Sequence, residues 1–274
     1  MMYRGMSIYS KLHKGNVGGL MKENLLFYNA YQKFYKMAEK SEVFKTYCKK
    51  AFGEDFSQDG FSDINQLDKI LSMVDIDDRA NVLDVGCGNG KMLEYIHYKT
   101  GASIYGFDYS ENAINSARKR MGERGDFKVA IIGEAEYEDN KFDLITSMDT
   151  MYFAPNMTAF VSQIYRWLKS KGSFICGYQE GDVMKKTKDY NTTELAKALR
   201  ENGIKYTVTD YTKETYDMLK YKRAVIKSMK EDFVKEGLLM WYRVIKGQTN
   251  SVKGSYNKYK KNNARYIYKV VKED

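Results

Sequence analysis

A glycine-rich segment in the first half of the chain carries residue types suited to binding a nucleoside-like ligand. Val82–Gly90 reads VLDVGCGNG, so an apolar run passes into three glycines at alternate positions. Glycines let the backbone pass close to a ligand. The spacing is GxGxG, not the GxGxxG of dinucleotide-binding loops, and Asp84 before Gly86 is a poor neighbour for phosphates. The pattern therefore predicts a site for a ligand that has a ribose and no pyrophosphate.

A second acidic residue, Asp108, ends the next predicted strand, Ala102–Phe107. Its carboxylate can accept hydrogen bonds from both hydroxyls of a ribose. Asp84 suits the ammonium group of S-adenosylmethionine, directly or through a water molecule. Cys87 lies inside the glycine loop, where its small size explains it and nothing nearby marks it as a nucleophile. We therefore predict an S-adenosylmethionine site that needs no metal.

The residues that would meet a methyl acceptor follow later strands. Asp149 comes just after the predicted strand Phe142–Met148 and is predicted to pair with an ammonium. A cofactor contact or a helix N-cap are the alternatives. Tyr152 and Tyr178 follow two predicted strands at the same rim, and aromatic faces hold a sulfonium or quaternary amine well; simple packing is the alternative. Lys253 either meets a phosphate or carboxylate or is solvated.

Strands and helices alternate from Asn81 onward, which is typical of a parallel sheet with helices on both faces. Ligands in such sheets bind beyond the carboxyl ends of the strands. The predicted strands are Val82–Val85, Ala102–Phe107, Phe127–Ile132, Phe142–Met148 and Gly172–Tyr178. The predicted helices between them are Lys91–Thr100, Asn112–Met121 and Met157–Leu168.

Two helical regions flank this alternating part. Residues 1–75 are predicted to form an N-terminal helical cap, because apolar residues recur near helical spacing within Glu23–Phe52 and Ile64–Val74. The core then spans residues 76–274. A helix at Thr193–Asn202 and a strand at Lys205–Asp210 precede a helical insert at about 211–263. We expect this insert to act as a substrate lid, with a polar loop, Gly247–Asn263, leading to a last strand, Ala264–Val271.

Charge and cysteine content restrict the classes of partner. The net charge is +9, and residues 211–274 carry 16 Lys/Arg against 7 Asp/Glu, so the basic excess is C-terminal. It could attract an anionic substrate group, RNA or a membrane surface, or form a solvated helix face. Three separated cysteines without a CxxC pair argue against zinc and disulfides and favour a reducing compartment. We expect a cytoplasmic protein with no signal peptide and no membrane span.

Four segments together resemble the class I S-adenosylmethionine-dependent methyltransferases. Val82–Gly90 is similar to their first motif, Tyr105–Ser110 to their second, and Phe142–Asp149 to their strand-four motif; Ile132–Ala135 lies where the family contacts adenine. The resemblance implies a Rossmann-like α/β fold with a seven-stranded sheet whose last strand lies antiparallel beside strand five. It implies cofactor contacts from Asp84, Gly86, Cys87, Gly88, Asp108, Tyr109, Gly133, Glu134, Ala135 and Met148.

A narrower likeness is to small-amine methyltransferases of the phosphoethanolamine and sarcosine/dimethylglycine types. It rests on Phe52-Gly53-Glu54, Gly60 and the helical insert before the last strand. The segment Gln58–Gly60 is then expected to line the cofactor site. The phosphoethanolamine enzymes have a catalytic Tyr–His pair; here Phe153 stands at the histidine position and Glu39 at the tyrosine position. The likeness therefore places Glu39 at the substrate site.

Methyl transfer from a sulfonium is an in-line displacement, so the protein mainly holds donor and acceptor in position. An ammonium acceptor must first lose a proton. We predict a methyltransferase for a small molecule, with an amine as the leading acceptor and with Asp149 and Tyr152 at the reacting centre. One alternative is an RNA methyltransferase that uses the basic C-terminal region, although no DPPY-like tetrad follows strand four. Another is a non-catalytic, cofactor-binding regulatory subunit.

Overall fold

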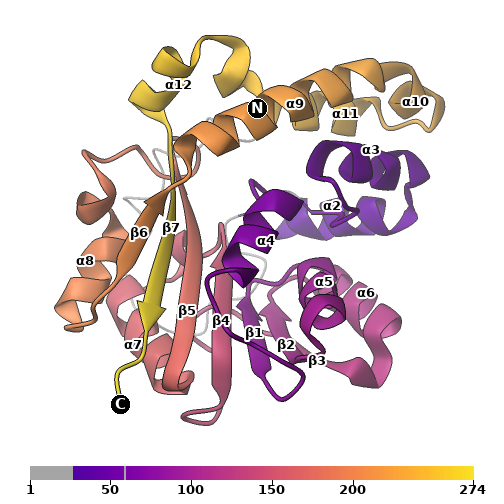
Figure 1. Ribbon diagram of the computed structural model, residues 1–274. Coiled ribbons are helices and arrows are strands. Elements are labelled where there is room, and N and C mark those ends of the chain that lie inside the picture. The colour runs from indigo at the N-terminus through magenta and orange to yellow at the C-terminus, as the bar shows by residue number, and fades with distance from the viewer. Residues whose placement is uncertain (1–26, 59) are drawn as a thin grey trace.

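A seven-stranded sheet forms the centre of the computed structural model, which describes residues 27–58 and 60–274 (Figure 1). Its order is β3-β2-β1-β4-β5-β7-β6. Neighbours pair in parallel except β7, which runs antiparallel to both β5 and β6. The strands are β1 (Asn81–Val85), β2 (Ser103–Asp108), β3 (Gly125–Val129), β4 (Phe142–Met148), β5 (Leu168–Glu180), β6 (Thr207–Asp210) and β7 (Ala264–Val271). The predicted Rossmann-like sheet, with an antiparallel last strand beside strand five, is confirmed.

Helices cover both faces of the sheet because successive strand residues point to opposite sides. Val82 belongs to an apolar cluster with the inward faces of α4, α5 and α6, whereas Leu83 belongs to a second cluster with α7 and α8. These helices are α4 (Ile64–Leu71), α5 (Lys91–Thr100), α6 (Glu111–Met121), α7 (Met157–Trp167) and α8 (Glu194–Glu201). The chain thus builds two cores, one on each side of the sheet.

The described part of the N-terminal region forms two further helices, α2 (Tyr28–Lys40) and α3 (Glu42–Phe52). The predicted continuous helical stretch is interrupted at Ser41, whose extended backbone caps α3 and whose Oγ accepts a hydrogen bond from Phe44 N at 2.9 Å. The predicted cap also includes residues 1–26, which lie outside the described residues.

The insert before the last strand lies over the carboxyl ends of the parallel strands, beside α2 and α3 (Figure 1). It comprises α9 (Thr212–Ser228), α10 (Lys230–Lys235), α11 (Leu239–Gln248) and α12 (Tyr256–Asn262). The polar loop predicted over Gly247–Asn263 contains α12, so that part of the prediction is wrong. Ser255 caps this helix and Tyr259 anchors it in the core, which offsets the polar composition of the segment.

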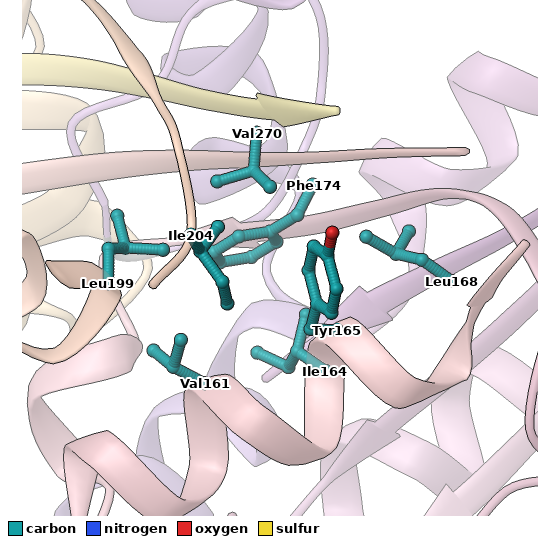
Figure 2. Close-up of a pocket in the computed structure, with 8 residues that line it drawn as sticks. All are labelled: Val161, Ile164, Tyr165, Leu168, Phe174, Leu199, Ile204 and Val270. Carbon is teal, nitrogen blue, oxygen red and sulfur yellow. The ribbon is translucent and has the colours of Figure 1, made fainter. Parts of the chain in front are cut away.

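An apolar gap lies at the opposite end of the sheet, between α7, α8, β5 and β7 (Figure 2). It is lined by Val161, Ile164, Tyr165, Leu168, Phe174, Leu199, Ile204 and Val270. Leu168 begins β5 and Val270 lies near the end of antiparallel β7, so the gap is near the amino ends of the parallel strands. Ligands of such sheets bind at the other edge, and we assign this gap to core packing.

Candidate functional site

The glycine loop after β1 has a backbone that other residues would strain. Gly86, Gly88 and Gly90 have φ values of 72°, 54° and 74°, in the left-handed region. A Cβ on Gly86 would lie 2.5 Å from Thr150 Cγ2, and one on Gly88 would overlap the hydroxyl of Tyr35 from α2. The loop is therefore narrow on both sides, and it leads directly into α5.

Asp84 lies beneath this loop and is 4% exposed. Its Oδ1 accepts a hydrogen bond from Thr146 Oγ1 at 2.8 Å. Burial raises the pKa of Asp84 to about 7, and the nearby charge of Asp108 adds to this shift. A cation placed beside Asp84 would reverse the shift by favouring the ionised carboxylate.

Asp108 ends β2 and joins the glycine loop to the next loop. Its two oxygens accept hydrogen bonds from Gly88 N at 3.1 Å and Ser110 N at 2.8 Å. Burial raises its pKa to about 6. Each carboxylate oxygen has two lone pairs, so both can still accept a hydroxyl group. The structure thus brings Asp84 and Asp108, predicted from separate strands, to one edge of the sheet.

Tyr109 and the turn that contains Gly133–Ala135, all predicted cofactor contacts, lie next to Asp108. Tyr109 packs against Tyr28 and Tyr31 of α2, with ring centroids 5.6 and 6.2 Å apart. Ala130 N donates to the Asp108 carbonyl at 3.1 Å, which brings the turn containing Gly133, Glu134 and Ala135 alongside β2. In that turn Ala135 is buried and Glu134 is exposed.

Cys87 is 8% exposed and packs over Gly106 on β2. Burial, with Asp108 and Asp84 close by, raises the pKa of its thiol well above the usual value. A thiol with a raised pKa is a poor nucleophile. The small side chain fits a packed position in the loop.

Asp149 forms an ion pair that was not predicted from the sequence. It follows β4 with a φ of 61°, and its Oδ1 accepts from Nη1 of Arg265 on β7. Its Oδ2 accepts from Phe61 N at 3.2 Å. The Arg265 side chain is fully buried and also donates to Gln66 Oε1 at 3.2 Å and Ser62 Oγ at 3.0 Å. A buried charge of this kind needs a partner, and Asp149 supplies it.

The segment between α3 and α4 is joined to both sides of the site. Lys91 Nζ, at the start of α5, lies 2.5 Å from Asp55 Oδ2 and 2.9 Å from Ser57 Oγ. Asn89 Nδ2 donates to Ser57 O at 3.2 Å. Gly60 lies close to Asp149, where an added Cβ would be 3.6 Å from Oδ2. This segment therefore crosses from the glycine loop to Asp149.

Tyr152 and Tyr178 lie in one aromatic cluster, with ring centroids 5.8 Å apart. They are 7% and 1% exposed. Burial raises the pKa of both hydroxyls well above the usual value, and neighbouring Asp149 contributes to the shift of Tyr152. A buried phenol with a raised pKa is suited to packing or hydrogen bonding and is a poor proton acceptor.

Glu39 and Lys253 are exposed in this structure and remain predictions as substrate contacts. The buried face of α2 instead presents Tyr35 to the glycine loop. Phe153, at the histidine position of the resembled family, packs against Tyr152 with centroids 5.1 Å apart. Met148, a predicted cofactor contact, lies beside Gln66, whose Nε2 is 3.6 Å from its Sδ.

Arg265 and Tyr35 are the residues that sequence reasoning missed. Arg265 had a signal, because it is a charged residue inside a largely apolar strand, ARYIYKVV, and arginine is rarely fully buried without a partner. Tyr35 had none, since it is one of several aromatics at helical spacing. Among the described residues, no group of three His, Cys, Asp or Glu could hold a metal ion.

Two known proteins are similar in sequence to part of this chain. A phosphoethanolamine N-methyltransferase of Plasmodium falciparum is 32% identical over 128 residues, 45% of this chain and 47% of that protein. Phosphoethanolamine N-methyltransferase 3 of Arabidopsis thaliana is 28% identical over 203 residues, 68% of this chain and 41% of that protein. The chain therefore spans less than half the length of these two relatives.

A solved Haemonchus contortus phosphoethanolamine N-methyltransferase 2, in complex with phosphomonomethylethanolamine and S-adenosylhomocysteine, has the same fold. Its TM-score is 0.71 at 20% identity, over 89% of this chain and 60% of that one. A "putative sarcosine dimethylglycine methyltransferase" from Galdieria sulphuraria gives a TM-score of 0.62 at 16% identity, over 77% of this chain and 85% of that one. The family described as "Methyltransferase domain" matches residues 76–245, more than half of the sequence, and this chain belongs to that family.

Proposed function

We propose that this protein is an S-adenosylmethionine-dependent methyltransferase that methylates a small amine. The observation that carries the proposal is the pair of buried carboxylates, Asp84 and Asp108, on either side of a glycine loop at the carboxyl edge of the sheet. The names of the relatives support an amine as the acceptor.

The residues around the loop fit this cofactor. Burial raises the pKa of both carboxyls, so the ammonium of the cofactor at Asp84 and two ribose hydroxyls at Asp108 would compensate the cost of ionising them. We assign cofactor contacts to Asp84, Gly86, Cys87, Gly88, Asp108, Tyr109, Gly133, Glu134, Ala135 and Met148. When bound, S-adenosylmethionine would supply an activated methyl group: the lone pair of an uncharged amine would bond to the methyl carbon in line as the C–S bond breaks, leaving S-adenosylhomocysteine and a methylated ammonium that loses its proton to solvent.

The acceptor side is assigned to the region around Asp149. Its carboxylate is fixed by Arg265 and Phe61, and its remaining lone pairs can accept N–H groups of the acceptor. Tyr152 lies next to it and forms one wall. We assign the insert, residues 211–263, as the lid, because it lies over the carboxyl ends of the strands beside α3 (Figure 1).

The location proposed is the cytoplasm. All three cysteines, Cys48, Cys87 and Cys176, are free and buried, which suits a reducing compartment. None of the helices in the described residues has the length and apolar character needed to cross a membrane.

The test is transfer of a labelled methyl group from S-adenosylmethionine to a panel of acceptors. The panel contains phosphoethanolamine, ethanolamine, sarcosine and dimethylglycine, with phenols, carboxylates and bulk tRNA as comparison classes. We expect transfer to at least one amine and none to tRNA. Transfer to tRNA alone, with a steep dependence on salt, would replace the amine by RNA. Binding of the cofactor without transfer to any class would indicate a regulatory subunit.

A further inference from the structure

We propose that Gln179 and Tyr259 form a hydrogen-bonding subsite for the acceptor and that Gln179 Oε1 accepts an N–H of the amine. The inference rests on the proposed function and extends it to residues outside the predicted set. Gln179 lies near the carboxyl end of β5, and Tyr259 lies on α12 of the insert.

The sheet places Gln179 beside the Asp149 ion pair. Gln179 and Arg265 are directly paired in the β5–β7 register, so their side chains leave the same face of the sheet. Gly177 shares that face, and a Cβ there would lie 2.7 Å from Arg265 Nη2. The Arg265 side chain therefore crosses Gly177 on its way to Asp149. Gln179, Arg265 and Asp149 form one continuous polar strip.

Gln179 has an acceptor oxygen that no described residue satisfies. The residue is 2% exposed, and its Nε2 donates to Glu180 O at 3.0 Å. That bond determines which end of the amide is the donor, since a carbonyl cannot donate to a carbonyl. Gln179 Oε1 is left without a hydrogen-bond partner in the described part of the chain. A buried polar atom of this kind calls for a ligand or a water molecule.

Tyr259 provides a second unsatisfied group next to the first. It is 1% exposed, and its hydroxyl likewise has no hydrogen-bond partner among residues 27–58 and 60–274. Burial raises its pKa to about 12, while the adjacent Gln179 side chain and the charge of Arg265 act in the opposite direction. The hydroxyl therefore lies next to Gln179 and the charge of Arg265.

The chemistry of these atoms selects the ligand. The charges of Arg265 and Asp149 cancel, so the strip offers no net attraction for a simple anion. Gln179 Oε1 can only accept a hydrogen bond, so its partner must be a donor. An amine that presents one N–H to Asp149 and another to Gln179 keeps its lone pair free to react. A tertiary amine has no N–H left for Gln179.

The test compares steady-state kinetics of the full chain and its variants with phosphoethanolamine and with phosphomonomethylethanolamine. Gln179→Leu should raise the KM for phosphoethanolamine about tenfold, as expected for one lost hydrogen bond, and leave the KM for S-adenosylmethionine unchanged. The increase should be smaller for phosphomonomethylethanolamine, whose uncharged nitrogen has one N–H fewer. Tyr259→Phe, which removes a single oxygen, should raise the same KM severalfold.

Tyr137→Phe is the matched control. It removes another buried hydroxyl that has no hydrogen-bond partner among the described residues, and the Tyr137 ring packs against Phe142 and Trp167 in the other core. It should leave both KM values unchanged, and thermal melting should show that all variants fold. Unchanged KM values in both Gln179→Leu and Tyr259→Phe, in a protein that methylates phosphoethanolamine, would overturn the subsite alone. A wild-type protein that methylates no amine would overturn the proposed function and the subsite together.

Discussion

The carboxylates of the site differ in what surrounds them. Asp84 and Asp108 are buried and accept hydrogen bonds from uncharged groups, namely Thr146 Oγ1 for Asp84 and the Gly88 and Ser110 amides for Asp108. Asp149 is neutralised by Arg265. The first two are thus suited to receiving a cation and hydroxyl groups from a ligand, whereas the third is already held in a fixed orientation. This contrast is consistent with the proposed division of the site into a cofactor half and an acceptor half.

Replacing Asp108 tests the cofactor half. Asp108→Ala should weaken binding of S-adenosylmethionine by roughly 1.5–3 kcal/mol, because charge-assisted hydrogen bonds to the ribose are lost. Calorimetry measures the change directly. Asp126→Ala on β3 is the control, since Asp126 is exposed and lies 3.7 Å from Lys128 in a solvent-exposed ion pair. Unchanged affinity in Asp108→Ala would remove the cofactor assignment.

Replacing Asp149 tests the acceptor half and the ion pair together. Asp149→Asn tolerates the left-handed backbone but leaves Arg265 buried without a counter-ion, so the free energy of unfolding should fall by about 3–5 kcal/mol. Adding Arg265→Gln should recover much of this stability in chemical denaturation. Turnover should stay low in the double variant, and cofactor affinity should change less than turnover. If turnover and cofactor affinity fall equally, Asp149 belongs to the cofactor site.

At the scale of elements, the site is closed by segments from both ends of the described chain. The α3–α4 segment contacts the glycine loop and Arg265. The start of α3 contacts the insert, because Glu236, just after α10, accepts hydrogen bonds from Ser41 Oγ and Val43 N, both at 3.1 Å. Cap and insert are therefore mechanically connected above the sheet.

Ser41→Ala should weaken that connection. The change removes the N-cap bond to Phe44 N and the bond to Glu236, and we expect a loss of about 1 kcal/mol in the free energy of unfolding. Urea denaturation measures it. Ser72→Ala is the control, because Ser72 is exposed at the end of α4 and its hydroxyl donates only to Lys69 O. Equal effects of the two substitutions would contradict the role of Ser41.

At the scale of the whole molecule, the two buried acids make the stability of the fold depend on pH. The folded-state pKa values of Asp84 and Asp108, about 7 and about 6, lie above the ordinary value of 3.8. At a pH between the ordinary and the raised pKa values, the native state therefore binds more protons than the unfolded state. Their contribution to stability is present at low pH and is lost as pH rises from about 4 to about 7.

The raised pKa of Asp84 predicts how affinity for the cofactor should change with pH. Affinity for S-adenosylmethionine should rise as pH increases through about 6 to 7, because the ammonium favours ionised Asp84. Calorimetry across this range measures the change. The rise should be reduced in Asp84→Asn, which cannot ionise, and retained in the exposed-site variant Asp126→Ala. A pH-independent affinity in the wild-type protein would exclude Asp84 as the titrating group.

Local sequence patterns were enough to predict the residues of the proposed cofactor half and the order of the core elements. The glycine loop, Asp84 and Asp108 lie in or next to strands with clear apolar runs, so local patterns place them at one edge of the sheet. Strand ends were less predictable: β5 begins at Leu168, and α12 forms inside a polar segment, because packing of Tyr259 outweighs local composition.

The contacts of the proposed acceptor half, in contrast, depend on long-range packing. Asp149 and Arg265 are 116 residues apart and meet because β7 inserts beside β5 and Gly177 leaves room for the guanidinium. Gln179 and Tyr259 come together for the same reason, when the insert folds back over the sheet. Tyr35 on α2 contacts Gly88, although no sequence motif marks this part of α2 as a neighbour of the glycine loop. Such contacts depend on which distant surfaces are buried together, and that is a property of the packed chain rather than of any local spacing.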